Sequence, residues 1–103
     1  MSDRYDAYDR LKFDTPADRI LRITMDAPGH LNAADETMHD ELGRIWKDVE
    51  ADPEISVAIL RGAGDAFSAG GDFDMIDKMI DKFEVRARVW KEARDLVYNV
   101  INC

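Results

Sequence analysis

The chain has 103 residues and a formal net charge of −8, from 14 Lys and Arg against 22 Asp and Glu. This length suits one domain, and 46% hydrophobic beside 35% charged residues predicts a folded globular chain. The acidic balance argues against nucleic acid or an anionic membrane as the main partner, because both bind basic patches. The sequence has no apolar run of the ~18 residues that a membrane span needs. A single cysteine, Cys103, and an N-terminus without a secretory pattern predict a cytoplasmic protein.

Two short strands are predicted near the start of the chain. Residues 1–10 are polar with two interspersed tyrosines and are expected to form an irregular arm. Apolar and polar residues alternate over Leu11–Asp14 and again over Leu21–Met25, which predicts an antiparallel hairpin. The turn between the strands is expected at Thr15–Asp18, where a proline presets φ.

An amphipathic helix is predicted between residues 32 and 51, where the apolar residues recur with a helical period. Its apolar stripe consists of Met38, Leu42, Ile45, Trp46 and Val49. The charged residues, Glu41 among them, are expected on the solvent side. Asn32 or Asp35 would cap the helix start, and Asp52-Pro53 would end it.

The rest of the chain predicts a buried strand, a loop and two helices. Ile55–Leu60 is almost continuously apolar, which is typical of a parallel strand covered on both faces. The loop from Arg61 to Gly71 holds four of the six glycines. A short helix is expected from Asp72, and its inward-facing residues would be Phe73, Ile76, Ile80 and Phe83. A longer helix is expected from about Val85, and its inward-facing residues would be Val89, Ala93, Leu96, Val97, Val100 and Ile101. This order predicts an α/β fold.

Several common motifs fail on spacing. The segment Gly62–Phe67 follows a strand, but Phe67 stands where a dinucleotide fingerprint needs its third glycine. A phosphate-binding Gly-Lys-Ser/Thr is missing from the sequence, and the region after Asp72 lacks the glycine and glutamate of a calcium loop. His30 and His39 have no third ligand at zinc spacing, so no metal site is expected.

The segment from Phe67 to Phe73 keeps two interpretations open. A buried strand, a turn without bulky side chains and a capping Asp72 would leave bare amides near a helix start, where they bind anions or a developing oxyanion. Alternatively, the turn needs its glycines only for their φ angles. The residues alone favour neither interpretation.

Two separated motifs resemble the enoyl-CoA hydratase/isomerase, or crotonase, superfamily. They are Leu31-Asn32-Ala33 and the stretch from Gly62 to Phe73, which contains Phe67-Ser68-Ala69-Gly70-Gly71-Asp72-Phe73. The resemblance covers about residues 11–103 and implies the N-terminal part of a crotonase-like ββα spiral fold, as in the ClpP/crotonase group. It also implies a trimer or a dimer of trimers.

The resemblance implies roles for particular residues. Gly71, which stands where relatives often have alanine, would be catalytic and give one amide of the oxyanion hole that binds the acyl-CoA carbonyl. Backbone around Leu31, Asn32, Ala33, Ala69, Gly71, Asp72 and Phe73 would contact the substrate and its CoA group. His30 precedes the first motif where relatives often carry a basic residue for a CoA phosphate. No cofactor is expected beyond the CoA of the substrate.

The resemblance also implies that part of the active site is missing from the chain. The second oxyanion amide and the proton-transfer carboxylates of the family would lie beyond Cys103, on the remainder of this protein or on a second chain. Hydration of a 2-enoyl-CoA is the expected reaction, with isomerisation, hydrolysis and cleavage as variants. A non-catalytic fragment or assembly subunit that folds with a partner chain is the alternative, and a small CoA- or nucleotide-binding module is the third.

Overall fold

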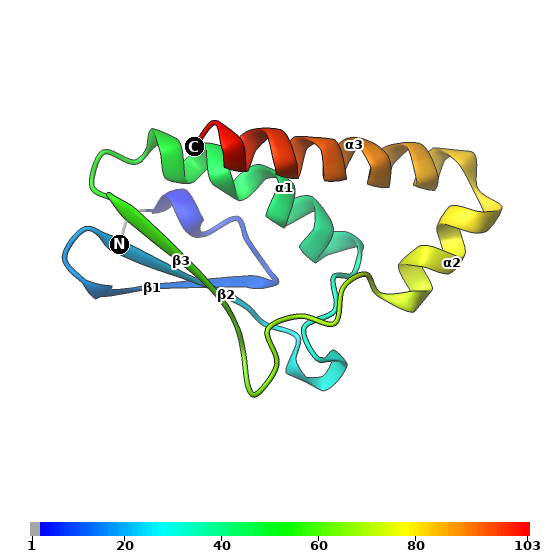
Figure 1. Cartoon of the computed structure of the whole chain (residues 1–103), viewed down its shortest axis with the longest axis horizontal. Helices are drawn as coiled ribbons and strands as arrows, with labels where there is room; N and C mark the ends of the chain where they lie inside the picture. Colours follow the sequence, from blue (N-terminus) through cyan, green and yellow to red (C-terminus); the bar gives the residue numbers. More distant parts are fainter. Residues whose placement is uncertain (1–2) are drawn as a thin grey trace.

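The structure is a computed structural model and describes residues 3–103. The elements in chain order are the 3-10 helix η1 (Asp3–Tyr5), β1 (Leu11–Ala17), β2 (Ile20–Met25), the 3-10 helix η2 (Pro28–His30), α1 (Glu36–Ala51), β3 (Val57–Gly62), α2 (Phe73–Asp81) and α3 (Phe83–Ile101) (Figure 1). This order confirms the predicted succession of hairpin, helix, strand, loop and two helices. None of the helices in residues 3–103 is both long and apolar enough to cross a membrane.

The predicted hairpin is confirmed, but its turn lies further along the chain. β1 and β2 pair antiparallel, and β1 continues to Ala17 through the residues expected to turn. The reversal falls at Arg19, which adopts a positive φ of 61°. Pro16 lies where the register shifts between Asp14 and Ala17. An edge strand tolerates a proline at such an irregularity, because the missing N–H breaks no ladder.

β3 joins the sheet parallel to β2, with α1 as the crossover between them. Ala58 and Leu60 pack against the core, as predicted for one face of this strand. The prediction that both faces are covered is wrong for the described residues, since Val57 and Ile59 on the other face are 52% and 41% exposed. The continuous apolar run therefore belongs to a strand with one face against the core and the other face exposed in the described residues.

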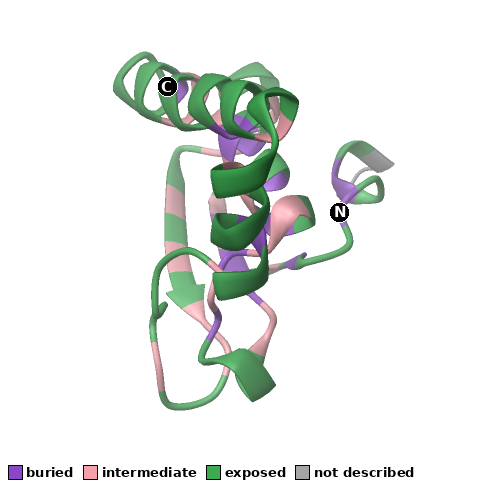
Figure 2. Ribbon diagram, turned by 90° about the vertical axis from the view of Figure 1, so that its right-hand side faces the viewer, coloured by how far each residue is buried: buried purple, intermediate pink, exposed green. Residues whose placement is uncertain are grey.

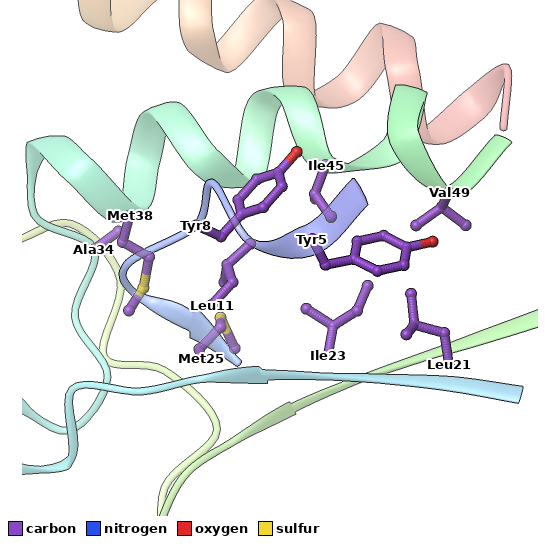
Figure 3. Packing of buried hydrophobic residues seen from close by; sticks show 10 residues of the cluster. All are labelled: Tyr5, Tyr8, Leu11, Leu21, Ile23, Met25, Ala34, Met38, Ile45 and Val49. Carbon is purple, nitrogen blue, oxygen red and sulfur yellow. The ribbon is translucent and has the colours of Figure 1, made fainter. Parts of the chain in front are cut away.

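The hydrophobic core lies between the sheet and α1 (Figure 3). Its buried members are Tyr5, Tyr8, Leu11, Leu21, Ile23, Met25, Ala34, Met38, Ile45 and Val49. The stripe predicted for α1 is confirmed by this list, with Leu42 and Trp46 packed at its edge. Asp35 caps the helix through a 2.8 Å hydrogen bond from the Met38 amide to its Oδ1.

The segment expected to form an irregular arm is packed on the core. Residues 1 and 2 lie outside the described residues, but Tyr5 and Tyr8 are only 5% and 6% exposed. Their rings fill apolar space against Phe13, while their hydroxyls donate hydrogen bonds to Asp52 and Asp48 of the α1 end. An aromatic ring with a polar tip suits this position, because the ring is buried and the hydroxyl keeps a partner.

Glu41 departs from the prediction that it faces solvent. It is 1% exposed, and its carboxylate accepts hydrogen bonds from the main-chain amides of Asp9, Arg10 and Leu11. A buried carboxylate is tolerated where amide donors replace its water. Glu41 therefore belongs to the inner face of α1.

α3 packs across the outer side of α1, so the chain has three layers: sheet, α1 and α3 (Figure 1). Gly43 allows the close approach, because a Cβ there would lie 3.2 Å from the main-chain oxygen of Glu92. The buried Asn99 donates a 2.8 Å hydrogen bond to the Gly43 oxygen, and His39 Nδ1 lies 2.8 Å from Glu92 Oε1. Polar contacts therefore contribute to this interface between the two helices.

The predicted inward faces of α2 and α3 are mostly wrong. Met75 is the buried residue of α2, whereas the predicted Phe73, Ile76, Ile80 and Phe83 are exposed. On α3, Val89 is buried and Leu96 half-buried, but the outer side is exposed (Figure 2). The exposed members of its predicted stripe are Ala93, Val97, Val100 and Ile101. The helical period is correct but the face is rotated, because Glu92 and Asn99 take inward positions against α1.

Candidate active site

The loop between β3 and α2 begins where the chain folds tightly back over the end of β3. A Cβ at Gly62 would lie 2.2 Å from the main-chain oxygens of both Ala66 and Phe67, and 2.7 Å from Asn32 Nδ2. Such distances exclude any larger residue without movement of the backbone. Glycine at this position therefore fixes the path of the loop.

Asn32 holds this loop to the segment before α1. Its side chain is fully buried, and its Oδ1 accepts a 2.9 Å hydrogen bond from the Ala27 amide. Its Nδ2 donates 2.8 Å hydrogen bonds to the main-chain oxygens of Ala63 and Ala66. Asn32 adopts a positive φ of 56°, which asparagine tolerates better than most residues. The two sequence motifs are thus joined through one amide side chain.

A short parallel bridge between Ala34 and Gly71 positions the second half of the loop. The Ala34 amide donates a 2.7 Å hydrogen bond to the Gly70 oxygen, and the Asp72 amide donates a 2.9 Å hydrogen bond to the Ala34 oxygen. Successive backbone groups of an extended segment point to opposite sides. The Gly71 amide between these two contacts therefore points away from Ala34.

The Gly71 amide stands out from its neighbours. The amides of Ala69, Gly70 and Asp72 donate to Leu31 O, Ser68 Oγ and Ala34 O respectively. Within residues 3–103, no group accepts a hydrogen bond from the Gly71 amide, and Gly71 is exposed. A free amide held between bonded ones is available to an external acceptor.

The start of α2 lies directly after this amide. Asp72 Oδ1 caps the helix by accepting hydrogen bonds from the amides of Asp74 at 2.9 Å and Met75 at 3.4 Å. The cap fixes the direction in which the chain leaves Gly71. A Cβ at Gly71 would lie 3.3 Å from Ile76 Cδ1, the end of a flexible side chain, so alanine would fit with a small shift.

Glu36 connects the three helices near the site. Lys78 of α2 and Arg88 of α3 each place a nitrogen 3.0 Å from a Glu36 carboxylate oxygen. The hydrogen bond from Lys78, then the charges of Lys78 and Arg88, hold the pKa of Glu36 below its usual value despite partial desolvation. This ion-pair cluster joins the last turn of α2 and the helix α3 to the start of α1.

A cleft of about 580 Å³ lies beside the loop. Its lining includes Ala33 and Asp72 from the two motifs, and the basic residues Arg10, His30 and Lys78. Several carboxylates lie among them, so the cleft carries charges of both signs. Gly71 does not line it. Within the described part of the chain, no group of three His, Cys, Asp or Glu residues is arranged to hold a metal ion.

The structure brings the predicted site residues together around one loop, but they differ in exposure and in hydrogen bonding. Leu31 and Phe73 are 60% and 83% exposed, and Ala69 is exposed beside them. Asn32 is buried, and its side chain supports the loop. Sequence reasoning missed Ala34, whose two hydrogen bonds orient Gly71. Alanine carries no chemical signal, so only the tertiary structure identifies this role.

Comparison with known proteins decides the family. Residues 16–103 match the sequence profile of a family described as enoyl-CoA hydratase/isomerase. The chain belongs to this family. The enoyl-CoA hydratase/isomerase resemblance carried by the two motifs is thereby confirmed, and with it the crotonase-like α/β fold.

Individual enoyl-CoA hydratase/isomerase relatives are similar over most of the chain. EchA13 of Mycobacterium tuberculosis, which bears the name of an enoyl-CoA hydratase, is 40% identical over 76 residues, covering 73% of this chain. The 1,2-epoxyphenylacetyl-CoA isomerase of Escherichia coli is 36% identical over 62 residues, covering 60% of this chain. The chain spans only 24% and 23% of these relatives.

A solved structure of the family shows the same fold. The enoyl-CoA hydratase/isomerase from Mycobacterium paratuberculosis superimposes with a TM-score of 0.86 at 30% identity. The alignment covers 92% of this chain and 38% of that one. The 103 residues thus correspond to somewhat more than a third of that structure.

Proposed function

We propose that this chain supplies the carbonyl-binding half of an acyl-CoA enzyme of the hydratase/isomerase type. The observation that carries the proposal is the exposed Gly71 amide, which has no acceptor within residues 3–103 while its neighbours are bonded. That amide would donate a hydrogen bond to the thioester oxygen of an acyl-CoA. The family membership and the names of the relatives, which include a hydratase and an isomerase, support a CoA thioester as substrate.

Hydration of a 2-enoyl-CoA is the reaction that we favour. A water molecule would give one proton to a base as its oxygen bonds to C3, the C2–C3 π electrons would move toward the carbonyl, and negative charge would gather on the thioester oxygen. C2 would then take a proton. A donor aimed at that oxygen stabilises the transition state more than the ground state, and losing one such donor costs about 100- to 1000-fold in rate.

The other loop residues would hold the CoA part of the substrate. Leu31 and Ala33 flank the buried Asn32, and Ala69, Asp72 and Phe73 flank the free amide. Backbone groups in these positions would contact the nucleotide and the pantetheine arm. Asp72 Oδ1 already accepts the first amides of α2, so we assign Asp72 to helix capping and give it no role in proton transfer.

The proposal is tested with but-2-enoyl-CoA carrying 13C at the thioester carbon. In the wild-type protein we expect a hydrogen bond to lower the carbonyl stretching frequency of the bound thioester. The Gly71→Pro variant removes the donor and should lose this shift. The Gly71→Ala variant retains the amide and should keep it, because Ile76 can yield to the added methyl.

Binding of CoA without an acyl group provides the control, since it needs no oxyanion donor. We expect Gly71→Pro to bind CoA like the wild type while losing its preference for the thioester. A normal shift in a folded Gly71→Pro protein would rule out the proposed role of the amide. Absence of saturable thioester binding to the wild-type protein would also reject the proposal.

The exposed apolar side of α3 favours a second candidate, a chain that works only in a larger assembly. Val97, Tyr98 and Ile101 are 59%, 65% and 75% exposed on this helix. Exposed patches of this kind mark surfaces that another chain or domain covers. Native mass spectrometry of the purified protein tests the candidate: trimers, hexamers or a co-purifying chain would support it, and a monomer would contradict it.

A further inference from the structure

We propose that the Ser68 hydroxyl is a positioning group for the Gly71 amide, an inference that rests on the proposed function. Ser68 Oγ donates a 3.0 Å hydrogen bond to the main-chain oxygen of Asn32. Ser68 Oγ also accepts a 3.1 Å hydrogen bond from the Gly70 amide. One hydroxyl thus bridges the first motif to the residue directly before Gly71.

The peptide unit between Gly70 and Gly71 contains the amide in question. Its carbonyl oxygen accepts the 2.7 Å hydrogen bond from Ala34, and the described residues contain no cis peptide. In a trans unit the N–H points opposite to the C=O, so the direction of the Gly71 amide follows the plane of this unit. Anything that rotates the plane changes the aim of the amide.

The plane of this peptide unit could rotate through the backbone torsion angles of Gly70. Gly70 has a φ of +95°, and a Cβ there would meet nothing within 4 Å. Glycine has the least restricted torsion angles of all residues. No atom of the described residues lies close enough to a Cβ at Gly70 to restrict them sterically. Two hydrogen bonds restrain Gly70: its amide donates to Ser68 Oγ, and its carbonyl oxygen accepts from the Ala34 amide. Loss of the Ser68 hydroxyl would leave Gly70 with only the hydrogen bond from Ala34.

Ser68 acts through Gly70 and is therefore a positioning residue, without contact to the reacting atoms. Ser68 is exposed; its hydrogen bond with Gly70 is exposed and that with Asn32 is partly buried, and Ser68 is not a member of the core between the sheet and α1. Removing these two hydrogen bonds should change the fold stability little. Small errors in aim weaken an oxyanion contact strongly, because the donor must meet the oxygen with good distance and angle.

The test compares Ser68→Ala with Ser68→Thr in the full chain, using the same 13C-labelled but-2-enoyl-CoA. Ser68→Ala should reduce the preference for the thioester over CoA about five- to tenfold, the worth of one hydrogen bond, and weaken the carbonyl shift. Ser68→Thr keeps the hydroxyl and should restore both. Ser56→Ala is the matched control. Ser56 directly precedes β3, at the end of the strand away from the loop, and its hydroxyl accepts a hydrogen bond from Arg19.

The outcomes separate this inference from the proposed function. A normal carbonyl shift and preference in Ser68→Ala, with both lost in Gly71→Pro, would overturn the role of Ser68 alone. Normal values in both variants would overturn the proposed function as well. Failure of Ser68→Thr to restore the shift would also count against the hydroxyl. If Ser68→Ala does not fold, Ser68→Cys replaces it, since a thiol is a weak hydrogen-bonding group.

Discussion

Glu41, in the middle of α1, accepts a 3.1 Å hydrogen bond from the main-chain amide of Leu11, the first residue of β1. The same carboxylate receives the amides of Asp9 and Arg10 at 2.8 and 2.9 Å. These three amides precede or begin an edge strand, where they would otherwise need water. A helix side chain therefore sets where β1 begins and how the N-terminal segment lies on the core.

The Glu41→Ala variant should be destabilised by about 2–4 kcal/mol, because it leaves the Leu11 amide without a partner in a buried position. Glu41→Gln keeps one acceptor oxygen and should lose about half as much. Urea unfolding at neutral pH measures both values. Equal stability of Glu41→Ala and the wild type would contradict the bracing role of this carboxylate.

The Asn32→Asp variant should be destabilised by about 3 kcal/mol or more. The substitution keeps the shape of the side chain but turns an oxygen toward the main-chain oxygens of Ala63 and Ala66, which now receive hydrogen bonds from Nδ2. Asn102→Asp is the control, because the same chemical change falls on an exposed residue and should shift stability by less than about 0.5 kcal/mol. Similar losses in the two variants, measured by thermal unfolding, would refute the importance of the buried amide.

The Gly62→Ala variant should be destabilised by about 3 kcal/mol or more, since its methyl would lie 2.2 Å from two main-chain oxygens. Gly29→Ala places the same methyl where nothing lies within 4 Å and should change stability little. Denaturant unfolding of the pair isolates the close approach from the general cost of replacing glycine. A folded Gly62→Ala protein with unchanged stability would show that the loop takes another path.

The contact between Tyr5 and Asp52 should make part of the stability depend on pH. The Tyr5 hydroxyl donates a 2.7 Å hydrogen bond to Asp52 Oδ2. This bond, followed by the Glu54 amide, lowers the pKa of Asp52. Burial first, and then the Asp52 contact, raises the pKa of Tyr5. The Asp52 contribution is present above about pH 4 and is lost as pH falls, and that of Tyr5 is present below about pH 10 and is lost as pH rises.

The Tyr5→Phe variant measures this pH dependence. It should be about 1–2 kcal/mol less stable than the wild type between about pH 5 and 9, with the difference shrinking on either side. Tyr98→Phe is the control, because the same atom is removed at an exposed position and should change the stability little. A difference for Tyr5→Phe that is constant from about pH 3 to 11 would show that neither titration is coupled to folding.

Much of the fold could be predicted because local patterns already encode it. The alternation in β1 and β2 and the helical stripe of α1 follow from residues that share one buried face. The faces of α2 and α3 could not be predicted. On α3, the polar residues Glu92 and Asn99 turn inward to partners on α1, while apolar residues such as Ile80 on α2 remain exposed. Hydrophobicity alone cannot show that a polar side chain has a partner from a distant segment.

The sequence by itself determined the order of elements, the family and the glycine-rich turn, because spacing and residue type are local properties of the chain. Only the tertiary structure decided which amide of that turn is free. Ala34 and Ser68 form the hydrogen bonds to Gly70, and the alternating direction of the backbone then leaves the Gly71 amide without an acceptor in the part of the chain that the structure describes. Such an outcome depends on contacts between segments that lie more than 30 residues apart in the sequence, such as Asn32 and Ser68, which are separated by 36 positions.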